Sequence, residues 1–302
     1  MFKGVSKKMK SFLFLFVVAF FLSTENSHSS IFPAKKTVSS EEGRAPTIVY
    51  APRKISKGEK LSLIISLHGY SSNPSQQRFV LPLNYLSSKR KTIVAVPSGI
   101  KDKKGKRFWS GLNCCDGHAD QVPNDVSFLR SIINKLKKEY PINEDKIFVA
   151  GFSNGGFMAY RMACEASDLI SGVVSFAGSG PMESQKCEPI RPLKVLHIHS
   201  TKDKTILFEG SGPAAGGPFE GSRWHPSAYK TVSFWEEKNL CSGGSFQGSS
   251  FRATLGRKIN VKKTHGCQAN GKVEFWTIDG ASHYYYLGLR EVKKIYDFFE
   301  IK

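Results

Sequence analysis

The chain has 302 residues, with 44 lysines and arginines against 25 aspartates and glutamates, which gives a formal net charge of +19. Hydrophobic residues make up 40% and charged residues 23%, and this balance excludes a mostly disordered chain, a collagen repeat, a coiled coil and a polytopic membrane protein. The length allows one large or two modest domains with a sizeable core.

The excess of positive charge has two interpretations. It indicates either an anionic partner, such as an acidic polysaccharide or a membrane surface, or an ordinary solvated basic surface. The sequence has no zinc-finger spacing, no RNA-binding aromatic motif and no helix-turn-helix pattern, so we expect no nucleic-acid partner. Contact of the protein with an anionic surface is one of these two interpretations, and the sequence does not choose between them.

Residues 1–29 have the pattern of a secretory signal peptide. Four lysines precede an apolar run from Phe12 to Leu22, which as a helix would span only about 16 Å of a bilayer core of about 30 Å. We expect cleavage, no stable membrane insertion afterwards, and a secreted or periplasmic protein; an uncleaved anchor is the alternative. The polar residues 30–47 predict a flexible leader with little fixed structure.

The cysteines fit an exported protein. There are six, at Cys114, Cys115, Cys164, Cys187, Cys241 and Cys267. An even number in an oxidising compartment predicts structural disulfides. We expect Cys241 to pair with Cys267, because they bracket one insertion-like segment, and we expect the adjacent Cys114 and Cys115 to bond to different partners. A zinc site is the alternative, but CxxC spacing is absent and no histidines cluster beside the cysteines.

From residue 48 onward, short apolar runs alternate with amphipathic stretches. The runs predict strands at 61–67, 92–96, 146–150, 172–177, 194–199 and 273–278, and the stretches predict helices at 123–140, 154–166, 229–240 and 289–299. This alternation predicts a single α/β domain over 48–302, with a mostly parallel central sheet and helices on both faces. We expect the Gly/Ser-rich and then basic segment 241–271 to form an irregular insert or a hairpin turning at Asn270-Gly271.

The motif G-x-S-x-G occupies residues 151–155, directly after a predicted strand and directly before a predicted helix. In this context the serine lies on a sharp, strained turn, and the flanking glycines let neighbouring backbone pass closely. The amino end of the helix then directs N–H groups toward the anion that forms on attack. The motif predicts that Ser153 is a catalytic nucleophile.

A serine nucleophile needs a general base and an acid that orients the base. Asp203 follows the strand predicted at 194–199, and His283 follows the strand predicted at 273–278, so both are expected at the same edge of the sheet as Ser153. Asp279 is the alternative acid. Of the eight histidines, His283 has the best order and context for the base.

The anion formed on attack needs two backbone N–H donors. We expect one from Asn154, which follows the nucleophile, and one from Tyr70 in the His-Gly turn after the first predicted strand. Trp109 and the tyrosines at 284–286 are candidate walls of the substrate pocket, although aromatic residues beside a loop are as often plain packing.

Several separated motifs over residues 48–302 resemble secreted α/β-hydrolases of the polyhydroxybutyrate depolymerase and feruloyl esterase type, close to carbohydrate esterase family 1. They are LHGY (67–70), FWSGLNCCDG (108–117), NDVSFLRSII (124–133), DKIFVAGFSNGGFMAYRMACE (145–165), HIHSTKDKTILFEG (197–210), FWEEKNLC (234–241) and IYDFF (295–299). The resemblance implies the same roles for Ser153, Asp203 and His283, and structural roles for Cys114 and Cys115. Such proteins often have proline where this chain has Lys204, and a Gly-rich stretch followed by Trp-Pro near the base, where this chain has DGASHYYYLG (279–288).

The sequence therefore predicts an exported serine carboxylic ester hydrolase that needs neither a metal nor an organic cofactor. Its expected substrates are hydroxycinnamoyl or acetyl esters of polysaccharide, or short hydroxyalkanoate esters of polyester oligomers. The alternative is a catalytically idle protein on the same fold, whose basic residues 101–107 bind anionic glycan or the cell envelope.

Overall fold

The computed structural model describes residues 33–39, 44–112, 114–115, 122–183, 185–212 and 224–302. The signal peptide predicted at 1–29 lies outside these ranges, and the leader predicted at 30–47 lies partly outside them. Within these ranges no helix has both the length and the apolar character needed to cross a bilayer.

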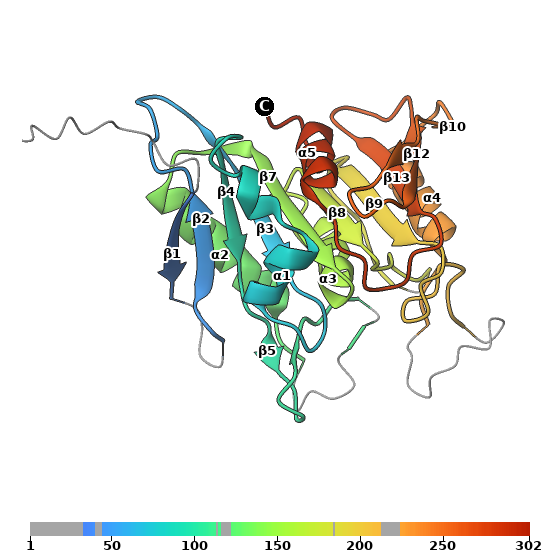
Figure 1. Ribbon diagram of the computed structural model, residues 1–302, viewed down its shortest axis with the longest axis horizontal. Coiled ribbons are helices and arrows are strands. Elements are labelled where there is room, and N and C mark those ends of the chain that lie inside the picture. The colour runs from blue at the N-terminus through green and yellow to red at the C-terminus, as the bar shows by residue number, and fades with distance from the viewer. Residues whose placement is uncertain (1–32, 40–43, 113, 116–121, 184, 213–223) are drawn as a thin grey trace, which may run out of the picture.

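A large, mostly parallel sheet forms the centre of the molecule (Figure 1). Its parallel strands, in spatial order, are β4 (Thr92–Val96), β3 (Leu61–Leu67), β7 (Ile142–Phe152), β8 (Gly172–Phe176), β9 (Lys194–Ser200) and β13 (Lys272–Ile278). Since β3, β4 and β8 are buried at every position, most of their residues are apolar on both faces, and polar residues do not alternate with apolar ones. All six strands expected from the sequence are present.

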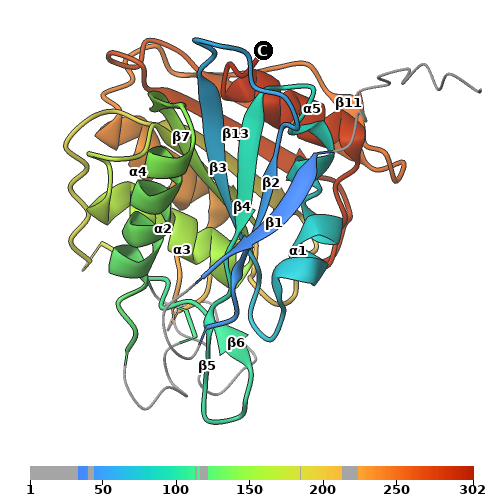
Figure 2. The same ribbon diagram turned by 90° about the vertical axis from the view of Figure 1, so that its left-hand side faces the viewer.

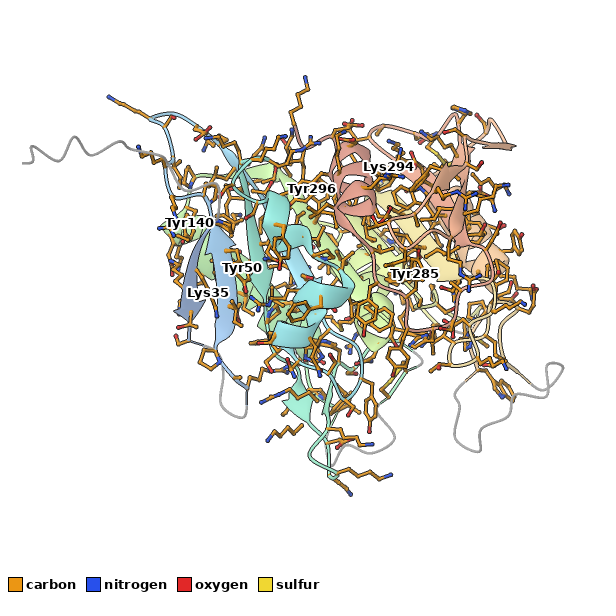
Figure 3. The ribbon with its side chains drawn as sticks, in the orientation of Figure 1. Lys35, Tyr50, Tyr140, Tyr285, Lys294 and Tyr296 are labelled. Carbon is orange, nitrogen blue, oxygen red and sulfur yellow. A yellow bond between two sulfur atoms is a disulfide. The ribbon has the colours of Figure 1, made fainter. Side chains whose placement is uncertain are left out.

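Helices cover both faces of this sheet, as Figure 2 shows from the side. One face carries α2 (Asp125–Glu139), α3 (Asn154–Glu165) and α4 (Ala228–Lys238), and the other carries α1 (Pro74–Val80), the 3-10 helix η1 (Leu83–Leu86) and α5 (Leu289–Phe298). Tyr296 of α5, labelled in Figure 3, is fully buried, and its hydroxyl donates to the Leu83 carbonyl at 2.9 Å. The predicted α/β class, with helices on both faces, is confirmed.

The two edges of the sheet contain strands that we did not predict. β2 (Thr47–Ala51) pairs antiparallel with β4, and β1 (Ala34–Val38) pairs antiparallel with β2 over its whole length. The expectation of little fixed structure is therefore wrong for Ala34–Val38. An edge strand needs only backbone hydrogen bonds to one neighbour, so its lysines remain in solvent and its sequence looks like that of a loop.

At the other edge, the insert also joins the sheet. β12 (Lys258–Thr264) pairs antiparallel with β13, and β10 (Ser245–Gln247) and β11 (Phe251–Arg252) both pair with β12. The expected hairpin is present, with the Gly271 N–H donating to the Gln268 carbonyl at 2.9 Å in its turn. The rest of the insert is more regular than expected, because the open edge of β13 offers it a backbone ladder.

Three disulfides are present. Cys241 pairs with Cys267, as predicted, and links the end of α4 to the connection between β12 and β13. Cys164 of α3 pairs with Cys187. Cys114 and Cys115 bond to each other, so the prediction of separate partners is wrong: the other four cysteines form two pairs among themselves.

Candidate active site

Ser153 lies on the turn between β7 and α3 with a backbone φ of 52° and ψ of −120°. A serine rarely adopts positive φ, and such strain costs about 1–3 kcal/mol. The surroundings fix the turn: the Ser153 N–H donates to the Phe176 carbonyl at 2.8 Å. A Cβ at Gly151 would lie 2.0 Å from the Gly155 carbonyl oxygen, and a Cβ at Gly155 would lie 2.3 Å from that of Leu67. Only glycine fits these two positions.

Three side chains predicted from separate segments meet at this turn. His283 Nε2 lies 2.9 Å from Ser153 Oγ, and His283 Nδ1 lies 2.7 Å from Asp203 Oδ2. All three residues are buried. An imidazole that donates its Nδ1 proton to a carboxylate leaves Nε2 free to accept the serine proton, which is the arrangement of a general base.

Asp203 follows β9 and is held by backbone as well as by histidine. Its Oδ1 accepts the N–H groups of Thr205 at 2.8 Å and Ile206 at 2.9 Å. Burial opposes ionisation of this carboxyl, but hydrogen bonds from His199 and His283 outweigh it and hold the pKa of Asp203 well below its usual range. The group is therefore a carboxylate near neutral pH.

The alternative acid, Asp279, has other partners. Its Oδ1 accepts a hydrogen bond from Asn260 Nδ2 at 2.8 Å, and its backbone N–H donates to the Lys258 carbonyl at 2.9 Å. Asp279 therefore stabilises the pairing of β12 with β13, whereas Asp203 is the carboxyl beside His283.

A row of buried polar side chains leads to Asp203, and it was not predicted from the sequence. His199 Nε2 lies 3.5 Å from Asp203 Oδ2 and 2.9 Å from the Ile206 carbonyl oxygen. Its Nδ1 lies 3.2 Å from His197 Nε2, and His197 Nδ1 lies 2.8 Å from the Tyr160 hydroxyl. Alternation along β9 was the available signal, because residues 197 and 199 must share a face.

Burial sets the charge state of His197. It holds the pKa of His197 well below its usual range, with a smaller contribution from His199. His197 is therefore neutral, and it connects Tyr160 to His199 without adding a charge behind the carboxylate.

The two expected N–H donors lie beside the nucleophile. Asn154 immediately follows Ser153, and a Cβ placed on Gly69, which precedes Tyr70, would lie 3.4 Å from Ser153 Cβ. Among the described residues, the backbone N–H groups of Tyr70 and Asn154 have no hydrogen-bond acceptor. Two unpaired N–H groups next to a serine hydroxyl can stabilise an oxyanion.

His68 fixes the orientation of the first donor. Burial lowers the pKa of His68 to about 4, so the ring is neutral. Its Nε2 accepts the Gly99 N–H at 3.0 Å, which leaves the proton on Nδ1, 2.8 Å from the Gly69 carbonyl oxygen. In a trans peptide the carbonyl and the next N–H point in opposite directions, so holding the Gly69 oxygen also sets the direction of the Tyr70 N–H.

The Asn154 side chain supports the same region. Its Oδ1 accepts the Trp109 N–H at 2.7 Å, and its Nδ2 donates to the Trp109 carbonyl at 2.8 Å. The Trp109 indole N–H donates to the His68 carbonyl at 3.0 Å, and the residue is fully buried. Trp109 is therefore a packing residue, and its interpretation as a pocket wall is wrong.

The three tyrosines that follow His283, at positions 284–286, lie in two different environments. Tyr284 is 69% exposed, and its ring centroid lies 5.1 Å from that of His283 and 6.1 Å from that of Phe152. Tyr286 is also exposed, whereas Tyr285, labelled in Figure 3, is buried in the core. Tyr284 thus presents an exposed aromatic surface next to His283.

The family model described as phospholipase/carboxylesterase matches residues 53–211, which include Ser153, Asp203 and the His-Gly turn. The chain belongs to the phospholipase/carboxylesterase family. Membership places it among the serine hydrolases that act on ester bonds, and the expectation of an α/β-hydrolase of the esterase type is confirmed.

Two known proteins are similar to this chain at low sequence identity. Feruloyl esterase B of Piromyces equi is 26% identical over 243 residues, which cover 78% of this chain and 42% of that protein. A bifunctional acetylxylan esterase/xylanase of Neocallimastix patriciarum is 26% identical over 170 residues, covering 56% of this chain and 23% of that protein. The chain thus spans less than half the length of each.

Solved structures show the same fold. An acetyl xylan esterase from Aspergillus awamori has a TM-score of 0.59 at 12% identity, covering 89% of this chain and 99% of that one. A structure described as a thermostable esterase has a TM-score of 0.55 at 16% identity, covering 89% of this chain and 62% of that one.

Proposed function

We propose that the protein is an exported serine hydrolase of carboxylic esters, with Ser153 as nucleophile, His283 as base and Asp203 as the acid that orients it. The observation that carries this proposal is the line from Asp203 Oδ2 through both His283 nitrogens to Ser153 Oγ, with contacts of 2.7 and 2.9 Å. Its catalytic domain extends over residues 48–302 together with the added strand β1 (Ala34–Val38), and a signal peptide at 1–29 precedes it. The three disulfides support export.

In the first half of the reaction, Ser153 Oγ attacks the ester carbonyl carbon while its proton passes to His283 Nε2. The carbonyl oxygen becomes an oxyanion that accepts hydrogen bonds from the Tyr70 and Asn154 N–H groups. The bond from carbon to the alcohol oxygen then breaks, and His283 donates the proton to the leaving alcohol. The product is an acyl group on Ser153.

Water completes the cycle. His283 removes a proton from water, whose oxygen attacks the acyl carbon, and a second oxyanion forms at the same two N–H groups. The bond to Ser153 breaks, the serine recovers its proton, and the carboxylic acid leaves. The Asp203 carboxylate stabilises the imidazolium in both halves. No step requires a metal or an organic cofactor.

The substrate proposed is an acylated polysaccharide, with hydroxycinnamoyl or acetyl groups as the acyl part. The names of the two relatives and the exposed Tyr284 ring beside the base support it, because an aromatic surface can stack against a cinnamoyl ring. Short hydroxyalkanoate esters are the second candidate, which rests on the resemblance of the sequence motifs.

Turnover of p-nitrophenyl acetate and butyrate tests the proposal. We expect wild type to hydrolyse both, and Ser153→Ala to reduce kcat at least about a thousandfold while remaining folded by circular dichroism. Turnover that survives Ser153→Ala, or its complete absence from wild type, would contradict the proposal. The second of these outcomes would favour the idle binding protein.

A further inference from the structure

A basic hairpin is attached to the loop that supplies the first oxyanion donor. β5 (Ile100–Lys101) and β6 (Arg107–Phe108) pair antiparallel, and Figure 2 shows the hairpin projecting from one end of the central sheet. The Ser71 N–H donates to the Arg107 carbonyl at 2.8 Å, directly after the carboxyl end of β3. The hairpin thus lies at the end of the sheet that carries Ser153.

Asp102 holds this attachment. Its Oδ2 accepts the Tyr70 hydroxyl at 2.6 Å, and its Oδ1 accepts the backbone N–H groups of Lys104 and Lys106 at 2.9 Å each. Lys106 Nζ lies 5.8 Å from the centroid of the Tyr70 ring. One tyrosine therefore separates the lysine-rich turn from the proposed oxyanion site.

The charge on this hairpin faces solvent. Its exposed cationic side chains are Lys101, Lys103, Lys104 and Lys106. Within the described part of the chain, Lys101 and Lys104 have no acidic partner, and the buried Asp102 is occupied by Tyr70 and backbone. Lys202 and Lys204, on either side of Asp203, are exposed as well. Positive charge therefore flanks the site from both the oxyanion loop and the acid loop.

We propose that the hairpin binds the polysaccharide part of the substrate, and that this polysaccharide carries carboxylates, as chains containing uronic acid do. The inference rests on the proposed ester hydrolysis and names its alcohol side. Exposed lysines in a rigid turn attract a polyanion and hold it while an acyl group borne on it reaches Ser153.

The hairpin lacks the features of a membrane-binding surface. Peripheral membrane binding usually combines basic residues with exposed apolar side chains. None of the large hydrophobic residues that the described chain exposes lies between residues 100 and 108, and Phe108 is fully buried. A hydrated, carboxylated glycan fits these lysines better than a lipid surface does.

Two charge-matched variants test the proposal. Lys101→Gln/Lys104→Gln removes two of the four exposed lysine charges of the hairpin, and Lys54→Gln/Lys57→Gln removes the same charge from exposed positions at the other end of β3. The substrates are acetylated xylo-oligosaccharides with and without glucuronate side groups. We expect the hairpin variant to lower the acidic-to-neutral ratio of kcat/KM about fivefold, and the control to leave the ratio unchanged. Added salt is expected to lower the wild-type ratio.

A binding experiment separates this inference from the proposed hydrolysis. De-esterified glucuronoxylo-oligosaccharide is titrated calorimetrically into Ser153→Ala with and without the two hairpin substitutions, and we expect the Kd to rise about fivefold when the lysines are removed. Equal effects of the hairpin and control substitutions, or no effect on binding, would overturn the inference even if ester hydrolysis holds. So would hairpin-dependent sedimentation with phosphatidylserine vesicles and no dependence for the oligosaccharide.

Discussion

At Ser153, backbone strain and side-chain chemistry depend on the same few contacts. The residue has positive φ because the chain must turn from β7 into α3 within one residue, and the glycines on either side allow it. The Leu67 carbonyl, at the end of β3, occupies the space where a Cβ at position 155 would lie. The turn at Ser153 is thus packed against the end of β3, directly before the His68-Gly69-Tyr70 turn.

Gly155→Ala tests this tight contact. A Cβ 2.3 Å from a backbone oxygen must displace either the helix or β3, so we expect a loss of about 3 kcal/mol or more in the free energy of unfolding, with loss of activity. The matched control is Gly212→Ala, where the nearest atom would be 4.0 Å away and we expect a change within about 0.5 kcal/mol. Urea unfolding measures both; similar stabilities for the two variants would disprove the contact.

The main site residues were accessible from the sequence because each one follows a strand whose carboxyl end reaches the same edge. Ser153, Asp203 and His283 could be placed by that rule before any distance was known. The contacts of Asn154 with Trp109 and of His199 with Asp203 could not, because they depend on side-chain distances between different segments.

Buried strands and long amphipathic helices could be predicted from the sequence, whereas the strands added at the edges of the sheet could not. Every predicted strand and helix is present, with ends that differ by a few residues. β1, β2 and β10 to β12 were missed. Of these, β1, β10 and β11 each pair with a single strand, and a strand with one neighbour has no strong apolar pattern. The choice of Cys241 and Cys267 as a pair succeeded because they flank one such segment.

Two of the disulfides are expected to differ in their contribution to stability. Cys241 and Cys267 lie 26 residues apart, so their cross-link raises the free energy of unfolding by about 3.5 kcal/mol through lost entropy of the unfolded chain. The adjacent Cys114 and Cys115 raise it by only about 1 kcal/mol. Urea unfolding of the two double serine variants measures this difference. A larger loss for the adjacent pair would contradict the expectation.

Buried histidines link the stability of the protein to pH. Burial lowers the pKa of His68 to about 4, and it also lowers the pKa of His197 and His225. The unfolded chain binds protons near pH 6.5 while the folded chain does not, so stability is fully present above that pH. It is lost as the pH falls from about 6.5 toward about 4.

Urea unfolding at pH 7 and pH 5 measures this linkage. We expect a lower free energy of unfolding at pH 5, with His68 contributing at most about 3 kcal/mol over its whole range. His68→Asn is expected to weaken the dependence on pH. Equal stability of the wild type at the two pH values would show that these rings are protonated in the folded state or are more exposed.

The central claim is that Ser153 is activated by His283. Diethyl p-nitrophenyl phosphate phosphorylates activated serines and releases p-nitrophenol, and mass spectrometry of the digested protein locates the adduct. We predict one diethylphosphoryl group per chain, on Ser153, and almost none in His283→Ala. Unmodified Ser153 in the wild type, or equal modification in His283→Ala, would contradict the account.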